Sequence, residues 1–147
     1  MAKKILYLDM DGVLVDFDSG ISSLSETQKI QYKNGYDQAP HIFSMMKPLK
    51  GAIEAYKKLI EKFDVFILTS SPWDNETALN DKLNWVKKYL TSDVRKKVIF
   101  SHRKDLLMGD YLIDDRKLNG AKNFKGEFIL FGSENFRDWS SVLKYLL

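Results

Sequence analysis

Short apolar runs recur along this chain and are separated by longer stretches of mixed polarity. Each run is apolar throughout and only three or four residues long, which is typical of strands buried on both faces of a sheet. Most of the runs end in a polar or glycine-containing turn. The runs span residues 5–8, 65–68, 98–100, 111–113 and 128–131.

Three stretches have apolar residues at the spacing of one buried helix face. The clearest runs from Pro48 to Phe63, and Pro48 is expected in its first turn, where the missing N–H is tolerated. Leu79, Leu83, Val86 and Leu90 mark a second helix, and residues 139–146 mark a closing one. Strands alternating with helices predict an α/β fold, a doubly wound (Rossmann-like) parallel sheet with helices on both faces.

Residues 15–47 do not follow this alternation. The stretch is rich in Ser, Gln and Lys, contains Gly35 and Pro40, and carries scattered aromatic residues. We interpret it as a small, mostly helical cap insertion after the first strand. The 147 residues, 44% of them hydrophobic and 29% charged, predict one domain over residues 1–147 with a single core.

Charge and composition exclude several classes of protein. The net charge of +3 comes from 23 basic and 20 acidic residues in short clusters, without the basic stripe of a protein that binds a nucleic-acid polymer. No apolar run approaches the roughly 20 residues that cross a membrane, and the first apolar run is too brief for a signal peptide, so we expect a cytoplasmic protein. Without cysteine, any metal must use oxygen or imidazole ligands.

Polar side chains follow three of the predicted strands directly. Asp9 and Asp11 follow the first strand, Thr69 and Ser70 the second, and Asp114 with Asp115 the run 111–113. The ligand crevice of a doubly wound sheet lies beyond the carboxyl ends of its strands. These residues are therefore expected at one edge of the sheet. We interpret Gly109-Asp110 only as the turn that leads into the run 111–113.

Asp9 and Asp11 suit phosphoryl transfer to a carboxylate. Gly12 permits a turn in which both side chains face the crevice, so that one attacks and the other moves a proton. Alone, this pair is equally compatible with a solvated turn. Asp114 and Asp115 repel one another unless a cation compensates them, and Mg²⁺ prefers such oxygen ligands. Asp9, Asp114 and the backbone carbonyl of Asp11 would make a suitable set.

Four segments, DMDGV, ILTS, Lys104 and GDYLIDD, closely resemble in this order the signature motifs of the haloacid dehalogenase (HAD) superfamily. The resemblance spans nearly the whole chain. Within the superfamily, DMDGVLVDF, the TSS-P turn, WVKKYL and GDYLIDDR look like the 5'(3')-deoxyribonucleotidases. The resemblance implies a magnesium-dependent phosphatase that acts on deoxyribonucleoside monophosphates through an aspartyl phosphate.

The same resemblance implies a role for each matching residue. Asp9 is expected as the nucleophile, Asp11 as the general acid/base, Asp114 as a further metal ligand and Asp115 as its support. Thr69, Ser70 and Lys104 are expected to bind the phosphate. Phe17, Phe43 and Arg116 are candidate substrate contacts, although aromatic residues at these positions more often pack in a core.

Two departures from the family bear on substrate choice. The insertion is shorter than the cap expected of these nucleotidases, and Ser71 is an additional residue before Pro72. Another small phosphomonoester, such as a sugar phosphate or a 3'-phosphate, is therefore an alternative substrate. A catalytically silent phosphate-binding module is disfavoured because every reactive side chain is present. We expect a monomer or homodimer, with Trp73 and His102 in ordinary surface or packing roles.

Overall fold

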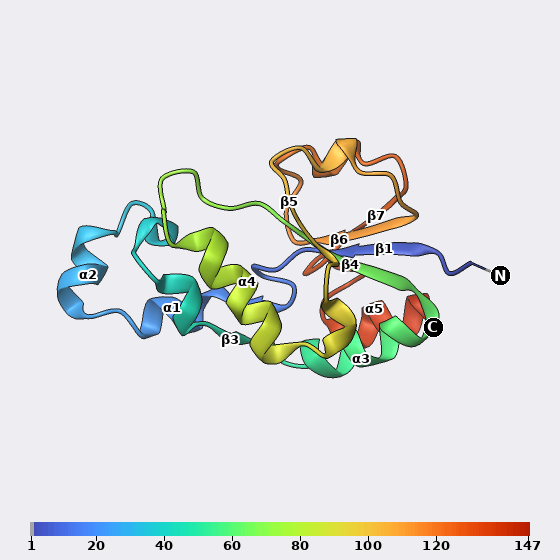
Figure 1. Cartoon of the computed structure of the whole chain (residues 1–147), viewed down its shortest axis with the longest axis horizontal. Helices are drawn as coiled ribbons and strands as arrows, with labels where there is room; N and C mark the ends of the chain where they lie inside the picture. Colours follow the sequence, from blue (N-terminus) through green and yellow to red (C-terminus); the bar gives the residue numbers. More distant parts are fainter. Residues whose placement is uncertain (1) are drawn as a thin grey trace.

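Five parallel strands form the central sheet of the computed structural model, which describes residues 2–147 (Figure 1). They are β1 (Ile5–Leu8), β4 (Asp64–Thr69), β5 (Val98–Phe100), β6 (Tyr111–Asp114) and β7 (Glu127–Leu130). Their order is β5-β4-β1-β6-β7, so the chain moves outward from β1 to β5 and then returns to the other side of β1. The predicted parallel α/β sheet is confirmed, and its strand order reverses at β1.

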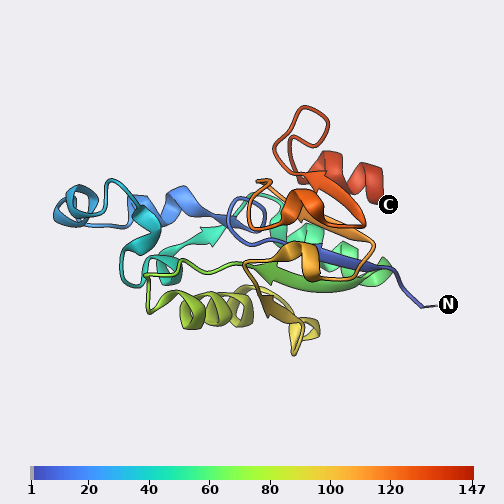
Figure 2. The ribbon, with the colours of Figure 1, turned by 90° about the horizontal axis from the view of Figure 1, so that it is seen from above.

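The two faces of the sheet are covered differently. Leu6 and Leu8 belong to the main core, where α3 (Ala52–Lys62) and α5 (Trp139–Leu146) pack on the lower face in Figure 1. Tyr7, between them, belongs to a smaller cluster on the opposite face. That face is covered by the segments on either side of β6, residues 101–110 and 115–126, with the 3₁₀ turns η4 (Lys104–Leu106) and η5 (Ala121–Asn123) (Figure 2). The flanking helices on this side are therefore single turns.

The helix predicted from Pro48 begins later, at Ala52. Pro48 instead ends β3 (Lys47–Pro48), which pairs antiparallel with β2 (Val15–Asp16). A short two-stranded ribbon accepts proline because few backbone N–H groups are needed there. Gly51, with φ of +81°, then turns the chain into α3. The predicted apolar face of that helix is otherwise confirmed, with Ala52, Ala55, Tyr56 and Leu59 buried.

Helix α4 (Ala78–Tyr89) exists as predicted, but its buried face was predicted only in part. Val86 and Leu90 are buried as predicted, whereas Leu79 is exposed and Lys82 and Trp85 are buried. Leu79 suggested a helix orientation about one residue out of phase with the real one. A lysine therefore points inward where an apolar side chain was expected. After α4, a 3₁₀ turn, η3 (Ser92–Val94), leads towards β5.

Residues 17–46, here called the insertion segment, leave the sheet at the carboxyl end of β1 (Figures 1 and 2). The segment contains α1 (Phe17–Ser22), α2 (Glu26–Gln31), η1 (Tyr36–Gln38) and η2 (Ile42–Met45). The indole of Trp85 on α4 donates to the carbonyl of Met46 over 3.0 Å. Asn75, just before α4, donates to the carbonyls of Asp37 and Ala39 over 2.8 and 3.1 Å. The insertion segment is thus tied to α4 and the loop before it.

Across residues 2–147, none of the helices combines the length and the apolar character that a membrane span needs.

Candidate active site

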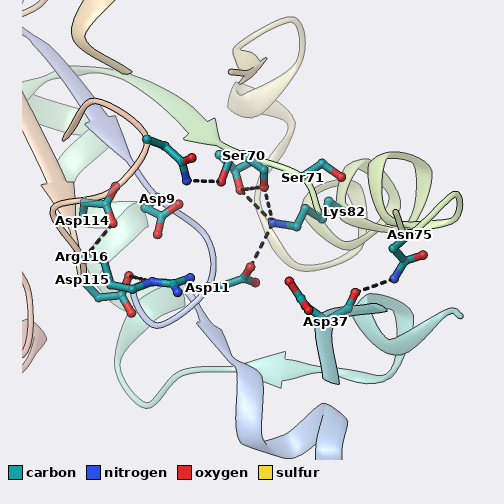
Figure 3. A network of polar contacts seen from close by, with 12 residues as sticks. Asp9, Asp11, Asp37, Ser70, Ser71, Asn75, Lys82, Asp114, Asp115 and Arg116 are labelled. Carbon is teal, nitrogen blue, oxygen red and sulfur yellow. Dashed lines mark hydrogen bonds and ion pairs between the residues drawn. The ribbon is translucent and has the colours of Figure 1, made fainter. Parts of the chain in front are cut away.

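The loop after β1 directs two carboxylates to the same edge of the sheet. The carbonyl of Met10 accepts hydrogen bonds from the N–H groups of Val13, Leu14 and Val15 at 2.8–3.1 Å, which makes the loop compact. Gly12 has φ of +79°, and a Cβ at this position would overlap the Asp115 carboxylate. The backbone therefore needs glycine here for both conformation and space. Asp9 and Asp11 flank Met10 at this edge (Figure 3).

Asp9 is buried beside a buried lysine. The Lys104 ammonium donates to Asp9 Oδ1 over 3.0 Å and to Asp114 Oδ2 over 2.6 Å. Burial raises the pKa of Asp9 to about 7, with Lys104 opposing the rise and Asp114 adding to it. Burial also disfavours the charge on Lys104, but the attraction of Asp9 and Asp114 outweighs it and raises the pKa of Lys104. Lys104 thus remains a cation placed between two carboxylates.

The acidic residues at this edge form a group suited to a divalent cation. Asp9, Asp114 and Asp115 each offer a carboxylate oxygen, and these oxygens lie within 4.8 Å of one another. Burial, and then the charge of Asp9, raises the pKa of Asp115 to about 6. Among the described residues, Asp115 Oδ1 is a buried atom with no hydrogen-bond partner. The exposed guanidinium of Arg116 lies 4.0 Å from the same Oδ1. One buried lysine and this exposed guanidinium leave the three carboxylates incompletely compensated, so the donor set fits Mg²⁺.

Asp11 is oriented differently from the other acidic residues. Its Oδ2 accepts a hydrogen bond of 3.0 Å from the ammonium of Lys82, on α4. Its Oδ1 is buried and has no hydrogen-bond partner among residues 2–147. Of the predicted metal ligands, the structure therefore groups the carboxylates of Asp9 and Asp114 with Asp115. The Asp11 carboxylate is held on the other side, by Lys82.

Thr69 and Ser70, at the end of β4, lie at the same edge but differ in burial and in hydrogen-bond partner. The Thr69 hydroxyl is buried and accepts from Lys82 over 3.0 Å. Ser70 lines the cavity described below, and its hydroxyl accepts from the amide of Asn119 over 3.0 Å. The structure thus brings both predicted residues to the site, with Ser70 the more open of the two.

Lys82 and Asn119 were not identified from the sequence. The signal for Lys82 was its place three and four residues before Trp85 and Val86, which puts a charged residue on an apolar helix face. Asn119 is followed by Gly120, and both have positive φ, of 55° and 81°. The Asn-Gly pair signals such a turn, but nothing in the pattern indicated that the turn would reach the active site.

A cavity of about 690 Å³ opens beside these residues. Its volume lies in the range of about 300–1,000 Å³ that is usual for small-molecule sites. The insertion segment contributes Phe17, Tyr36 and Asp37, and the turn after β4 contributes Ser70 to Trp73. A second pocket of about 20 Å³, here called the narrow extension, adjoins the cavity by sharing Asp11, Ser70 and Arg116 with it. It is also lined by Asp9, Lys104 and Asp114. The remaining lining residues include Gly12, His102, Asp115, Arg116, Leu118 and Asn119.

The three candidate substrate contacts are placed unequally. Phe17 and Arg116 line the cavity. Phe43 is 2% exposed and does not line it; its ring packs edge-on to Phe17 at 6.0 Å and lies under the Lys82 ammonium at 4.7 Å. Phe43 is a packing residue behind the cavity wall. Trp73, expected in a surface or packing role, is 88% exposed at the cavity mouth.

His102 and Asp110 also have identifiable partners. His102 Nε2 lies 2.7 Å from the Ser71 carbonyl. The imidazole ring of His102 packs edge-on to the indole ring of Trp73, with 6.2 Å between the ring centroids. The Asp110 carboxylate accepts from the N–H of Ile5 over 2.8 Å, just before β6 begins. Asp110 therefore links the start of β1 to the residue before β6, in agreement with its interpretation as a turn residue.

Comparison with known proteins gives a consistent result. Residues 20–144 match the family model described as 5' nucleotidase, deoxy (pyrimidine), cytosolic type C protein. A protein of Vibrio phage KVP40 assigned as a 5'(3')-deoxyribonucleotidase is 54% identical over 98% of this chain and 85% of its own length. A protein of Acanthamoeba polyphaga mimivirus with the same assignment is 33% identical over 76% of this chain and 62% of its own length.

Solved structures extend the comparison to the fold. The magnesium-bound YfnB from Bacillus subtilis, assigned to the HAD hydrolases, superposes with a TM-score of 0.65. The match covers 99% of both chains at 13% identity. At this identity the similarity concerns the fold alone.

Proposed function

The chain belongs to the cytosolic type C 5' nucleotidase family within the HAD hydrolases, and from this premise we propose that it is a magnesium-dependent 5'(3')-deoxyribonucleotidase. Membership of this family makes it a phosphoric monoester hydrolase. The proposed substrates are deoxyribonucleoside monophosphates. The observation that carries the proposal is the grouping of Asp9, Lys104 and Asp114 in a narrow extension of a cavity that also contains Asp11.

The reaction would proceed in two displacements at phosphorus. In the first, an Asp9 oxygen attacks phosphorus, the bond from phosphorus to the ester oxygen breaks, and Asp11 gives its proton to the departing alkoxide. In the second, Asp11 takes a proton from water, the water oxygen attacks phosphorus, and the bond from Asp9 to phosphorus breaks. Inorganic phosphate leaves, and both aspartates return to their starting states.

Lys104 supports this chemistry electrostatically. Asp9 must be ionised to attack, yet burial favours its protonated form. The Lys104 ammonium, 3.0 Å from Asp9 Oδ1, favours the carboxylate. The same cation would also stabilise negative charge on the transferring phosphoryl group.

Magnesium would be held by the carboxylates of Asp9 and Asp114 and by the backbone carbonyl of Asp11, with Asp115 supporting the site. When bound, the ion would neutralise phosphate charge. The clustered carboxylate oxygens support this assignment, as does Oδ1 of Asp115, a buried atom that accepts no hydrogen bond from residues 2–147.

The cavity supports a substrate larger than phosphate. Phe17, Tyr36 and the exposed Trp73 line the cavity but not the narrow extension that contains Asp9. They offer aromatic surface to the part of a substrate outside that extension. Ser70 and Arg116 lie between the two regions, since they line both the cavity and its narrow extension. A phosphate near Asp9 and a nucleoside in the wider part would use both regions.

Substituting the two aspartates tests the mechanism. We expect Asp9→Asn to abolish phosphate release, because an amide does not form the aspartyl phosphate. Asp11→Asn should slow both displacements by about 10²-fold to 10⁴-fold, the usual contribution of a positioned acid/base, while Mg²⁺ still binds. Phosphate release by each variant, with Mg²⁺ binding followed by calorimetry, is the measurement. Turnover by Asp9→Asn at the wild-type rate would refute the mechanism.

A substrate panel tests the nucleotide assignment separately. Deoxyribonucleoside 5'- and 3'-monophosphates, their ribose counterparts, sugar phosphates and an aryl phosphate would be compared by kcat/KM. We expect the deoxyribonucleotides to be preferred. If they are no better than the aryl phosphate, the substrate assignment fails and only a phosphatase remains.

A further inference from the structure

Lys82 is a fully buried lysine at the centre of the polar network in Figure 3. Its ammonium donates to Asp11 Oδ2 over 3.0 Å, to Thr69 Oγ1 over 3.0 Å and to the Ser70 carbonyl over 2.7 Å. The ring of Phe43 lies 4.7 Å from the same nitrogen. Lys82 therefore joins the loop after β1, the end of β4 and the insertion segment.

A buried ammonium is costly unless its donors are satisfied. Lys82 has three N–H donors and three acceptors within hydrogen-bond distance, and the Phe43 ring adds a favourable cation–π contact. No donor is left over for a phosphate oxygen. Its hydrogen bond to Asp11 indicates that Lys82 acts on the reaction through this aspartate.

The two oxygens of Asp11 are made unequal by this contact. Oδ2 accepts from Lys82, so a proton on Oδ2 would face a positive donor. Oδ1 has no hydrogen-bond partner among residues 2–147, and Asp11 lines both the cavity and its narrow extension. Oδ1 is therefore the oxygen that can carry the proton to a bound substrate. A fixed carboxylate orientation matters because a general acid must lie within hydrogen-bond reach of the departing oxygen.

We infer that Lys82 is a positioning residue for the acid/base Asp11: it anchors Oδ2, so that Oδ1 delivers the proton to the leaving alkoxide and later removes one from water. The inference rests on the proposed function. The proton on Oδ1 passes to the ester oxygen as the bond to phosphorus breaks, and Asp11 is then a carboxylate held by Lys82. Through its contacts with Ser70 and Phe43, the same lysine fixes Asp11 relative to the turn after β4 and to the insertion segment.

The leaving group provides the decisive test. A deoxyribonucleoside leaves as a basic alkoxide and needs the proton from Asp11, whereas p-nitrophenolate is a weakly basic leaving group that needs little help. The comparison uses kcat/KM, which reports the steps up to departure of the alkoxide, because the later attack of water on the aspartyl phosphate is the same for both substrates. In Lys82→Met, which keeps most of the side-chain volume, kcat/KM for a deoxyribonucleoside 5'-monophosphate should fall by about 10²-fold, the lower end of the acid/base contribution. For p-nitrophenyl phosphate it should fall only severalfold.

The ratio of the two rates does not depend on how much of the variant folds, because inactive protein lowers both rates equally. Lys87→Met, an exposed lysine on the same helix, is the matched control and should leave the ratio unchanged. In the double variant Asp11→Asn/Lys82→Met, the nucleotide rate should equal that of Asp11→Asn, because Lys82 acts through Asp11.

Three results would overturn the inference: an equal loss of kcat/KM on both substrates in which kcat also falls, a rise in KM for both with kcat unchanged, or a double variant much slower than Asp11→Asn. The second result would make Lys82 a phosphate ligand. Failure of the proposed function is distinguishable, since the wild-type protein would then release phosphate from neither substrate or would do so in Asp9→Asn.

Discussion

Gly12, in the active-site loop, is a position where even substitution by alanine should be harmful. We expect Gly12→Ala to lose about 1–2 kcal/mol of stability from its positive φ and, because its Cβ would displace Asp115, about 10²-fold in kcat. Gly132 is the matched control: its φ is +88° but a Cβ there would meet nothing within 4 Å. Gly132→Ala should lose similar stability and keep its activity. Denaturant unfolding and steady-state kinetics separate the two effects, and equal activity of the two variants would contradict this account.

Single residues were predictable from the sequence where strand ends determine their position. Asp9, Thr69 and Asp114 each follow a buried parallel strand, and such strand ends share one edge of the sheet. Lys82 comes from a helix, where burial depends on the rotation of the helix about its axis. Leu79 suggested the wrong rotation, because an exposed leucine is common and carries little information.

Among the structural elements, α4 and the loop before it hold the insertion segment in place. Asn75, 6% exposed, donates to two carbonyls of that segment, and its side-chain oxygen accepts from the N–H and hydroxyl of Thr77. Asn75→Ala should lose about 1–3 kcal/mol of stability, because it removes the hydrogen bonds that Asn75 donates to the carbonyls of Asp37 and Ala39.

The same variant should loosen residues 36–46. We expect faster amide hydrogen exchange in that segment and a higher KM for nucleotides, since Phe17, Tyr36 and Asp37 form part of the cavity wall. Asn80→Ala, at an exposed position of α4, is the control and should change neither quantity. Unchanged exchange in Asn75→Ala would show that the segment is held by other contacts.

At this scale the sequence predicted the existence of elements better than their boundaries. The apolar runs and the amphipathic helices are all present. Pro48 was assigned to a helix because proline suits a first turn, but it equally suits a short ribbon strand. The pairing partner, Val15, lies more than 30 residues earlier in the chain, and no local pattern reports such a contact.

For the molecule as a whole, the buried carboxylates couple the stability of the fold to pH. The pKa of Asp9 is raised to about 7 and that of Asp115 to about 6, chiefly by burial, above the usual value near about 4 for the unfolded chain. The folded protein thus binds more protons than the unfolded chain between these values. Without metal, the contribution of these two groups to stability is full below about pH 4 and is lost as pH rises through about 6 to 7.

Magnesium should reverse this loss. A cation that binds only the folded protein stabilises it, and it binds best when the carboxylates are ionised. Thermal unfolding with Mg²⁺ and with a chelator should therefore show an increase in Tm that is larger at pH 8 than at pH 5.

The variants Asp114→Asn and Asp9→Asn test whether the effects of Mg²⁺ and of pH on Tm arise at these carboxylates. Asp114→Asn should remove most of the increase in Tm with Mg²⁺. Asp9→Asn should flatten the decline of stability with pH in the chelator, because it removes the most strongly shifted carboxyl group. An increase in Tm independent of pH would argue against binding at these carboxylates.

The ribbon formed by β2 and β3 has an evolutionary consequence. Val15 pairs with Pro48 and Asp16 with Lys47, so the chain departs and returns at neighbouring points. Part of the chain between them packs on the core, but α2 contains no buried residue. To the catalytic core, the part around α2 is therefore equivalent to a hairpin loop, and doubling the length of a flexible loop costs only about 0.6 kcal/mol. Insertions and deletions can therefore accumulate there while the core remains unaltered. Substrate preference is free to diverge between descendants of one ancestor that all inherit the same chemistry.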